Sequence, residues 1–265
     1  MPMATVKNKK NSNFRKNNNK IDNINNKNNN NYNHYDYSPK SVIDYYDNWN
    51  VEEFPEYVRT LMNYEEKLVS HIFKNFLECY FKNKDIFILD CGCGFGSYYH
   101  LTKGYQNTIY FDISLNLLKK FKNKYPNLNM ICGDINSPPF KNGSFDLIMC
   151  INLLEHIDDH DKVINNLLRI LKDDGLLFIV VVNKKSIFKE EIFTSFNIFH
   201  KEYSIDDFKK YNIIEHSSFY FIHSIFKILP SFLLKKLINQ KKMVELNIKL
   251  GRLLNGQFLY VIIKK

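Results

Sequence analysis

The stretch FILDCGCGFG, residues 87–96, decides the fold class. Its apolar beginning predicts a short buried strand, and its glycines predict a tight turn where the backbone can approach a ligand that a Cβ atom would exclude. The glycines are spaced G-x-G-x-G, and Ser97 stands where a dinucleotide-binding turn has its third glycine. The stretch therefore predicts a ligand site at the end of a strand and argues against a pyrophosphate ligand, and so against a dinucleotide-dependent oxidoreductase.

Apolar strands and helices alternate on both sides of this turn. We expect two helices before it, at 41–49 and 51–80, and further helices at 115–124, 161–171 and 205–211. The expected strands are 86–90, 108–112, 129–132, 145–151, 176–182, 213–222 and 257–263. Alternation at this spacing predicts an α/β fold whose mostly parallel seven-stranded sheet is covered by helices on both faces.

The composition of the chain argues against a membrane-spanning, a secreted or a disulfide-rich protein. The chain has 265 residues, 45% hydrophobic and 25% charged, which is typical of a globular protein. It has no uncharged apolar stretch of the roughly 18 residues that a spanning helix needs, and no apolar secretory segment at its N-terminus. Five cysteines, an odd number, argue against a disulfide framework. These observations predict a reducing, cytoplasmic location.

The positive charge is concentrated at the N-terminus. Residues 1–40 hold eight Lys or Arg against two Asp, which is +6 of the total net charge of +9. Residues 1–34 also contain 14 Asn and few apolar side chains, so we predict a disordered Asn/Lys-rich arm over 1–36 and a folded domain over 37–265. Two explanations of the arm stay open: loose binding of RNA or anionic lipid, and a composition bias of the coding sequence.

Five stretches in register carry a resemblance to a known family. The chain resembles the class I S-adenosylmethionine-dependent methyltransferases, of the type that methylates quinones and other small molecules. The matching stretches are 89–96, 110–114, 133–140, 144–157 and 171–175. The resemblance implies a Rossmann-like domain with an antiparallel last strand, and S-adenosylmethionine as the cofactor.

The resemblance also implies which residues bind the methionine and ribose parts of the cofactor. Gly92 and Gly94 would lie under the methionine part, with Asp90 near its amino group. Asp112, which ends the second strand 22 residues after Asp90, would accept hydrogen bonds from the two ribose hydroxyls.

The adenine end follows the third strand. By the same resemblance, Asp134 would accept from the adenine amino group, and Ile135 would pack against the ring. An alternative for these acids is that they only form turns at strand ends. Cys91 and Cys93 form a C-x-C pair without a second pair elsewhere, so we predict no metal site.

The methyl group is activated by the cofactor's own positive sulfur, so the protein mainly aligns the reactants and no catalytic constellation need be visible. Three residues are candidates for a general base: His156, His200 and Tyr203. For His156 the alternative is that the Glu155–His156 pair only packs at a helix start. The aromatic residues of the first helix, Tyr46 and Trp49 among them, would either cover the cofactor or belong to the core.

The acceptor is predicted to be a small molecule. The segment 218–238 is rich in Phe, Ile and Leu with interspersed lysines, and 224–254 is predicted as one or two helices, broken near Pro230, inserted before the last strand. This segment has three interpretations: the wall of a pocket for a hydrophobic, lipid-like acceptor, peripheral contact with a membrane, or ordinary core. The alternative function is an RNA methyltransferase that uses the basic arm as a tether.

Overall fold

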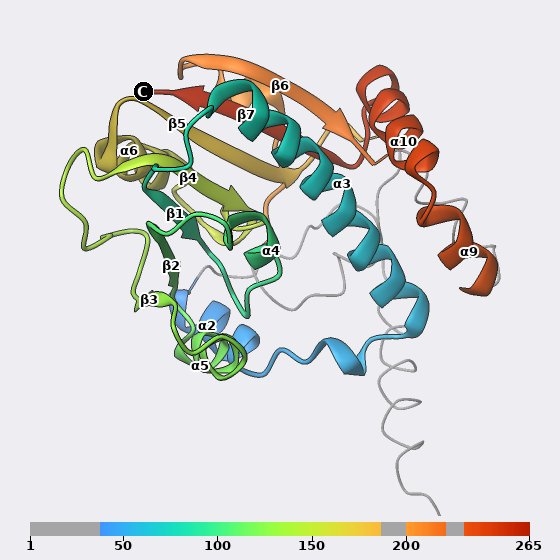
Figure 1. The fold of residues 1–265 in the computed structure, drawn as a ribbon, viewed down its shortest axis with the longest axis horizontal. Coiled ribbons are helices and arrows are strands. Elements are labelled where there is room, and N and C mark those ends of the chain that lie inside the picture. The colour runs from blue at the N-terminus through green and yellow to red at the C-terminus, as the bar shows by residue number, and fades with distance from the viewer. Residues whose placement is uncertain (1–37, 187–199, 221–230) are drawn as a thin grey trace, which may run out of the picture. The chain divides into compact units, whose positions relative to one another are not determined.

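The computed structural model describes residues 38–186, 200–220 and 231–265 (Figure 1). These residues belong to one compact unit that runs from Asp36 to Lys265. The predicted arm over 1–36 lies outside the described residues, and so do parts of two predicted elements, the end of the strand at 213–222 and the beginning of the helices at 224–254.

A seven-stranded sheet organises the unit, in the order β3-β2-β1-β4-β5-β7-β6. Neighbouring strands from β3 to β5 pair in parallel, whereas β7 is antiparallel to both of its neighbours. The strands are β1 (Ile88–Cys91), β2 (Thr108–Asp112), β3 (Asn129–Cys132), β4 (Phe145–Ile151), β5 (Leu171–Val182), β6 (Ile213–Phe219) and β7 (Phe258–Lys264). The predicted fold, with its antiparallel last strand, is confirmed.

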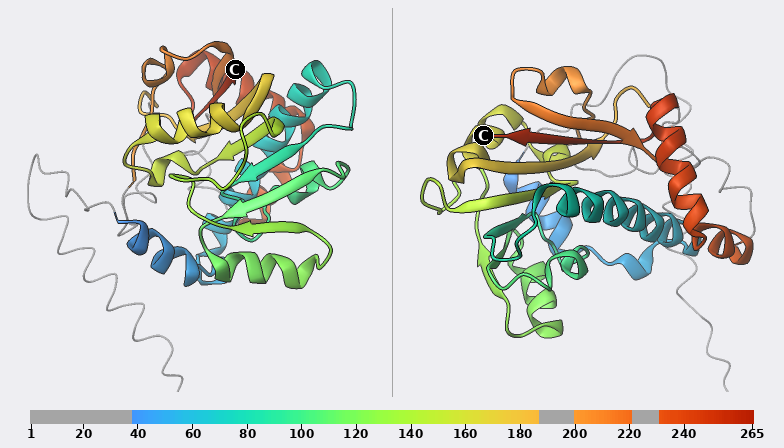
Figure 2. Two further views of the ribbon diagram at one scale, coloured as in Figure 1. Left: turned by 90° about the vertical axis from the view of Figure 1, so that its left-hand side faces the viewer. Right: turned by 45° about the horizontal axis from the view of Figure 1, so that its top comes forward.

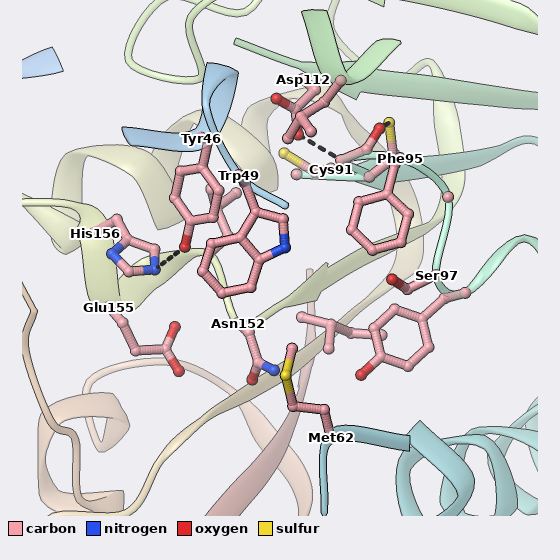
Figure 3. A pocket seen from close by; sticks show the side chains of 18 of the residues that line it. Tyr46, Trp49, Met62, Cys91, Phe95, Ser97, Asp112, Asn152, Glu155 and His156 are labelled. Atoms are coloured by element: carbon pink, nitrogen blue, oxygen red, sulfur yellow. Dashed lines mark hydrogen bonds between the residues drawn. The ribbon is translucent and has the colours of Figure 1, made fainter. Parts of the chain in front are cut away.

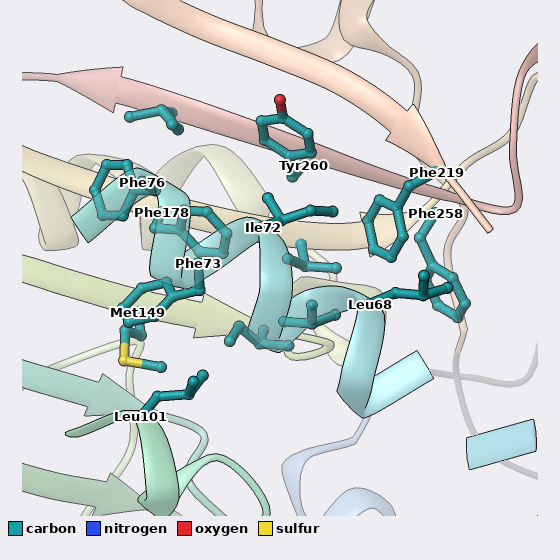
Figure 4. Close-up of a cluster of buried hydrophobic side chains, with 14 of the residues drawn as sticks. Leu68, Ile72, Phe73, Phe76, Leu101, Met149, Phe178, Phe219, Phe258 and Tyr260 are labelled. Atoms are coloured by element: carbon teal, nitrogen blue, oxygen red, sulfur yellow. The ribbon is translucent and has the colours of Figure 1, made fainter. Parts of the chain in front are cut away.

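Alternating side chains of the strands build a core on each face of the sheet. In β5, Phe178 and Val180 point to the face covered by α3 (Glu56–Tyr80), while Leu177 and Ile179 point to the face covered by α6 (His160–Ile170). Figure 4 shows the first core, where aromatic rings from α3 pack on aromatic rings of the strands. Residues 176–182 of β5 are buried on both faces, and their sequence is accordingly a continuous apolar run.

The N-terminal helices differ from the prediction at one point. The helix predicted over 51–80 is two elements, η1 (Val51–Glu53) and α3, preceded by α2 (Pro39–Asp47). The break falls at Pro55, because proline has no N–H to donate and disfavours helical geometry in the residue before it. Phe54 is accordingly extended, with φ −78° and ψ 147°.

Two helices that follow strands or loops of the sheet, α5 (Leu115–Lys124) and α6, start with side-chain caps. Ser114 accepts from the N–H of Leu117 at the start of α5, and Asp159 accepts from the N–H of Lys162 at the start of α6. The helix predicted at 205–211 is a short 3₁₀ helix, η3 (Ile205–Phe208). The sequence prediction missed α4 (Tyr99–Thr102), a single helical turn after β1.

The helical insertion before the last strand forms α9 (Ser231–Ile238) and α10 (Lys241–Leu254). Figures 1 and 2 show both helices at one side of the domain, remote from α5. Gly251 of α10 lies directly against β6, where a Cβ atom would come within 2.4 Å of the Cα of Phe219. This contact fixes α10 against the sheet.

In the turn after β1, both the backbone conformation and the packing require glycine at position 96. Gly96 has φ +89°, and a Cβ atom there would lie 2.3 Å from the ring of Phe121. Phe121 is fully buried and cannot move aside. We predict that Gly96→Ala lowers the free energy of unfolding by about 2 kcal/mol or more, measured by urea denaturation.

Gly104→Ala is the matched control, because Gly104 has no atom within 4 Å of a built Cβ and no positive φ. It should leave the free energy of unfolding within about 0.5 kcal/mol of the parent. Equal losses in the two variants would contradict the packing argument.

Candidate active site

One cavity of about 510 Å³ lies where the carboxyl ends of the parallel strands meet the N-terminal helices (Figure 3). It is lined by the loops after β1, β2, β3 and β4, and by residues of α2, η1 and α3. The predicted site residues that line it are Gly92, Gly94, Asp112, Asp134, Ile135, His156 and His200. Asp90 and Tyr203 are not among the lining residues.

Asp112 ties two of these loops together. Its Oδ2 accepts from the N–H of Gly94 at 2.8 Å, and its Oδ1 accepts from the N–H of Ser114 at 2.8 Å. Burial raises the pKa of Asp112, and the backbone N–H donors oppose that shift. Each carboxylate oxygen can accept more than one hydrogen bond, so both remain suited to ribose hydroxyls.

Asp90 lies in β1 beneath the turn, and its side chain is buried. Its Oδ2 has no hydrogen-bond partner among the described residues. Burial, with the nearby charge of Asp112, raises the pKa of Asp90 to about 7. A buried, unpaired carboxylate oxygen next to the turn fits a cationic donor, such as the ammonium group of a bound amino acid.

Asp134 is both a turn former and a lining residue. Its Oδ1 accepts from the backbone N–H of Asn136 at 2.8 Å and from the Asn136 side chain at 2.9 Å. Ile135 is buried beside it and lines the cavity. Asp134 therefore forms the turn that the sequence offered as one alternative, and it also lines the cavity, where contact with adenine stays a prediction.

An aromatic group covers the cavity on the side of α2. The hydroxyl of Tyr46 lies 2.6 Å from Nε2 of His156, and the ring of Trp49 lies 4.8 Å from that of Phe54. Trp49 lies between Asp112 and Asn152 in Figure 3. The α2 segment is held in place by hydrogen bonds from Ser114 to Asp47 and from Lys120 to the carbonyl of Trp49. These aromatic residues cover the site.

Two buried acceptors in this region were not predicted. Glu155 Oε1 accepts from the N–H of Val182 at 2.8 Å, and Asn152 donates to Glu65 at 2.6 Å. Glu155 Oε2 and Asn152 Oδ1 have no hydrogen-bond partner within the described part of the chain. Burial raises the pKa of Glu155 to about 8. Asn152 also has φ +52°, an uncommon conformation outside glycine.

The two remaining base candidates differ in their surroundings. His200 lines the cavity with its ring 5.5 Å from that of His156, and burial with the neighbouring imidazole lowers its pKa to about 4. It is therefore neutral at physiological pH. Tyr203 is fully buried, and its hydroxyl donates to the carbonyl of Leu154 at 2.8 Å. The structure places Tyr203 in the core.

Within residues 38–186, 200–220 and 231–265, no three or more His, Cys, Asp or Glu side chains are grouped as metal ligands. Cys91 and Cys93 are both buried and belong to two different apolar clusters. Cys91 ends β1 and Cys93 lies in the turn, and both pack as small apolar side chains.

Comparison with known proteins agrees with this site. Residues 89–179 match the model of a methyltransferase domain family. An uncharacterized protein of Methanocaldococcus jannaschii is 48% identical over 226 residues, which is 84% of this chain and 97% of that protein. The ubiquinone biosynthesis O-methyltransferase of Coxiella burnetii is 30% identical over 48% of this chain and 56% of its own length.

Solved structures share the fold at lower identity. An S-adenosylmethionine-dependent methyltransferase from Archaeoglobus fulgidus has a TM-score of 0.56 at 20% identity, over 76% of this chain and 94% of that one. Coclaurine N-methyltransferase, bound to N-methylheliamine and S-adenosylhomocysteine, has a TM-score of 0.52 at 16% identity over 76% of this chain and 70% of that one.

The fold, the glycine turn and the matched domain define the class: the chain belongs to the class I S-adenosylmethionine-dependent methyltransferases. Within that class it shares a family with the uncharacterized M. jannaschii protein, which it covers almost entirely. The cofactor is S-adenosylmethionine. No helix in the described part of the chain is long and apolar enough to cross a membrane.

The first prediction from this site concerns Asp112. Asp112→Asn keeps one carbonyl oxygen for the backbone but removes the charge that strengthens hydrogen bonds from hydroxyls. We expect the Kd for S-adenosylhomocysteine, measured by calorimetry, to rise about tenfold or more. Asp173→Asn is the control, since that side chain is 99% exposed, and its Kd should stay unchanged. Unchanged binding in Asp112→Asn would show that the ribose lies elsewhere.

The second concerns pH. Because burial raises the pKa of Glu155 from its usual value near 4.5 to about 8, the folded state binds a proton more tightly than the unfolded state. This contribution to stability is complete below the unfolded pKa and is lost as pH rises through about 8. Glu155→Gln should therefore flatten the fall in the free energy of unfolding between pH values of about 5.5 and 8, measured by urea denaturation.

Glu78→Gln, an exposed glutamate of α3, is the control and should keep the parent's pH dependence. If Glu155→Gln shows the same slope as Glu78→Gln, the buried carboxylate does not titrate in this range.

Proposed function

We propose that the protein transfers the methyl group of S-adenosylmethionine to a small, hydrophobic acceptor. The observation that carries the proposal is that one cavity contains both the glycine turn with Asp112 and an apolar wall. The wall is made by Val42, Trp49, Phe54, Val58, Leu61 and Met62. Apolar walls with few polar groups are typical of sites that bind hydrophobic small molecules.

The cofactor residues are part of the proposal. Gly92 and Gly94 would lie under the methionine part, with the Asp90 carboxylate beneath its ammonium group. Asp112 would hold the ribose. At the adenine end, Asp134 and Ile135 would contact the base. The unpaired Oδ2 of Asp90 and the positive φ of Gly92 and Gly94 support this assignment.

The cofactor supplies a methyl group already activated by a positive sulfur. The residues of this chain align the acceptor, exclude water and take up the proton that the acceptor loses. We assign the proton to His156, because its Nε2 already contacts a hydroxyl, that of Tyr46, at 2.6 Å inside the cavity. The unpaired oxygens of Asn152 and Glu155 offer acceptors for a hydroxyl or amine of the substrate.

Two relatives are named as methyltransferases of quinone biosynthesis, and this supports a hydrophobic acceptor. The C. burnetii relative is a ubiquinone biosynthesis O-methyltransferase, and a demethylmenaquinone methyltransferase of Renibacterium salmoninarum matches over 73 residues at 30% identity. These relatives do not favour the RNA methyltransferase alternative.

Two measurements test the function. S-adenosylmethionine with a labelled methyl group is incubated with the protein and cell extract, and the label is then followed into the organic-extractable, aqueous small-molecule and RNA fractions. We expect label in the organic fraction. Label confined to RNA or to polar metabolites would refute the hydrophobic acceptor, and failure of S-adenosylhomocysteine to bind folded protein would refute the site assignment.

The base assignment predicts a kinetic effect. His156→Gln should lower the rate of label transfer about 100-fold and change its pH profile, because general-base catalysis contributes at least that much. Its Kd for S-adenosylhomocysteine should stay within about twofold. His71→Gln, a histidine of α3 outside this cavity, is the control and should transfer at the parent rate.

A further inference from the structure

The insertion α9–α10 lies at the same edge of the sheet as the cavity. It leaves the sheet after β6 and returns at the beginning of β7, and this is the edge where the parallel strands end. Tyr220, directly after β6, and Phe258, the first residue of β7, both line the cavity. The two ends of the insertion are therefore part of the wall of the proposed active site.

One side of α10 faces away from the protein. Its buried residues, Asn247 and Gly251, lie on the side packed against β6. Residues 242, 246, 249 and 253 recur at helical spacing along the opposite side, and all four are exposed. They alternate lysine with leucine, and Leu253 is 68% exposed.

The preceding helix continues this surface. In α9, Phe232 is 70% exposed and Lys236, one turn later, is also exposed. Five of the eleven large hydrophobic residues exposed in the described part of the chain belong to these two helices. They are Phe232, Leu233, Leu246, Leu253 and Leu254. We call this the insertion surface.

Charge distinguishes the insertion surface from a general apolar patch. Residues 231–254 hold six Lys or Arg and one Glu, which is a net charge of +5. The chain carries +9 in total, of which the first 40 residues supply +6. The rest of the domain is therefore slightly acidic, and its positive charge is concentrated on the helices that expose leucine and phenylalanine.

We propose that the insertion surface docks on an anionic lipid bilayer. Leu246, Leu253 and Phe232 enter the interface, and the neighbouring lysines extend their ammonium groups to the headgroups. Helices that bind to the surface of an anionic bilayer have apolar and basic side chains of this kind. The proposal deepens the proposed function, because a hydrophobic acceptor dissolved in the bilayer would reach a cavity whose wall begins at the ends of this insertion.

Co-sedimentation of the full chain with vesicles of phosphatidylglycerol and phosphatidylcholine tests the docking. The double variant Leu246→Ser/Leu253→Ser keeps every charge, including those of the arm. We expect its partition coefficient to fall about tenfold or more relative to the parent. The control, Leu115→Ser/Ile214→Ser, removes two other exposed apolar residues and should bind as the parent does.

A local readout identifies the docking face. The chain has one tryptophan, Trp49, which lines the cavity and provides the baseline signal. Leu253→Trp should show added quenching by brominated lipid, whereas Phe87→Trp, exposed at the other end of the sheet, should not.

Three results would overturn the proposal. Equal sedimentation of the leucine double variant and its control would assign vesicle binding to the arm. Absence of binding by a protein that still binds S-adenosylhomocysteine would reject the docking and leave the proposed function intact. A dimer in solution that the leucine double variant abolishes, with no vesicle binding, would assign the surface to a second copy of the chain.

Discussion

The site depends on the pair of hydrogen bonds that Asp112 accepts from the backbone N–H groups of Gly94 and Ser114. These bonds join the loop after β1 to the loop after β2. They hold the glycine turn open toward the cavity. The same carboxylate lines the cavity, so a side chain with a structural role is also available to the ribose site that we propose. Burial raises the pKa of the neighbouring Asp90 in β1, and the charge of Asp112 raises it further.

Most of the residues that line the cavity come from three parts of the chain: the ends of the parallel strands, the helices before β1, and the two ends of the helical insertion. The parallel strands supply the glycine turn and the acids, to which we assign cofactor binding. The helices before β1 supply the apolar wall and Tyr46, and the ends of the helical insertion supply Tyr220 and Phe258. In our proposal the ends of the parallel strands hold the cofactor, while the helices around the sheet shape the space for the acceptor. Our proposals about the acceptor and the bilayer concern only these added elements.

Two of the buried polar atoms that have no partner among the described residues lie in the loop after β4, which lines the cavity. Asn152 has a positive φ, and its side-chain oxygen has no partner among the described residues; the same is true of one oxygen of Glu155. Such atoms cost free energy in the folded protein, and backbone strain of this kind is concentrated at functional sites. Both residues follow β4 and line the cavity, at the edge of the sheet where we propose that the methyl group is transferred.

Local sequence determined much of the fold. The bounds of β2, β3, β4 and α5 agree with the prediction to the residue, because apolar runs there end at acids, glycines or a capping serine that act on their immediate neighbours. Only the tertiary structure decided which base candidates reach the cavity. Tyr46 and His156 are 110 residues apart in the chain yet in contact, whereas Tyr203, close in sequence to His200, lies in the core. Such distances follow from how helices pack on the sheet, which no local pattern encodes.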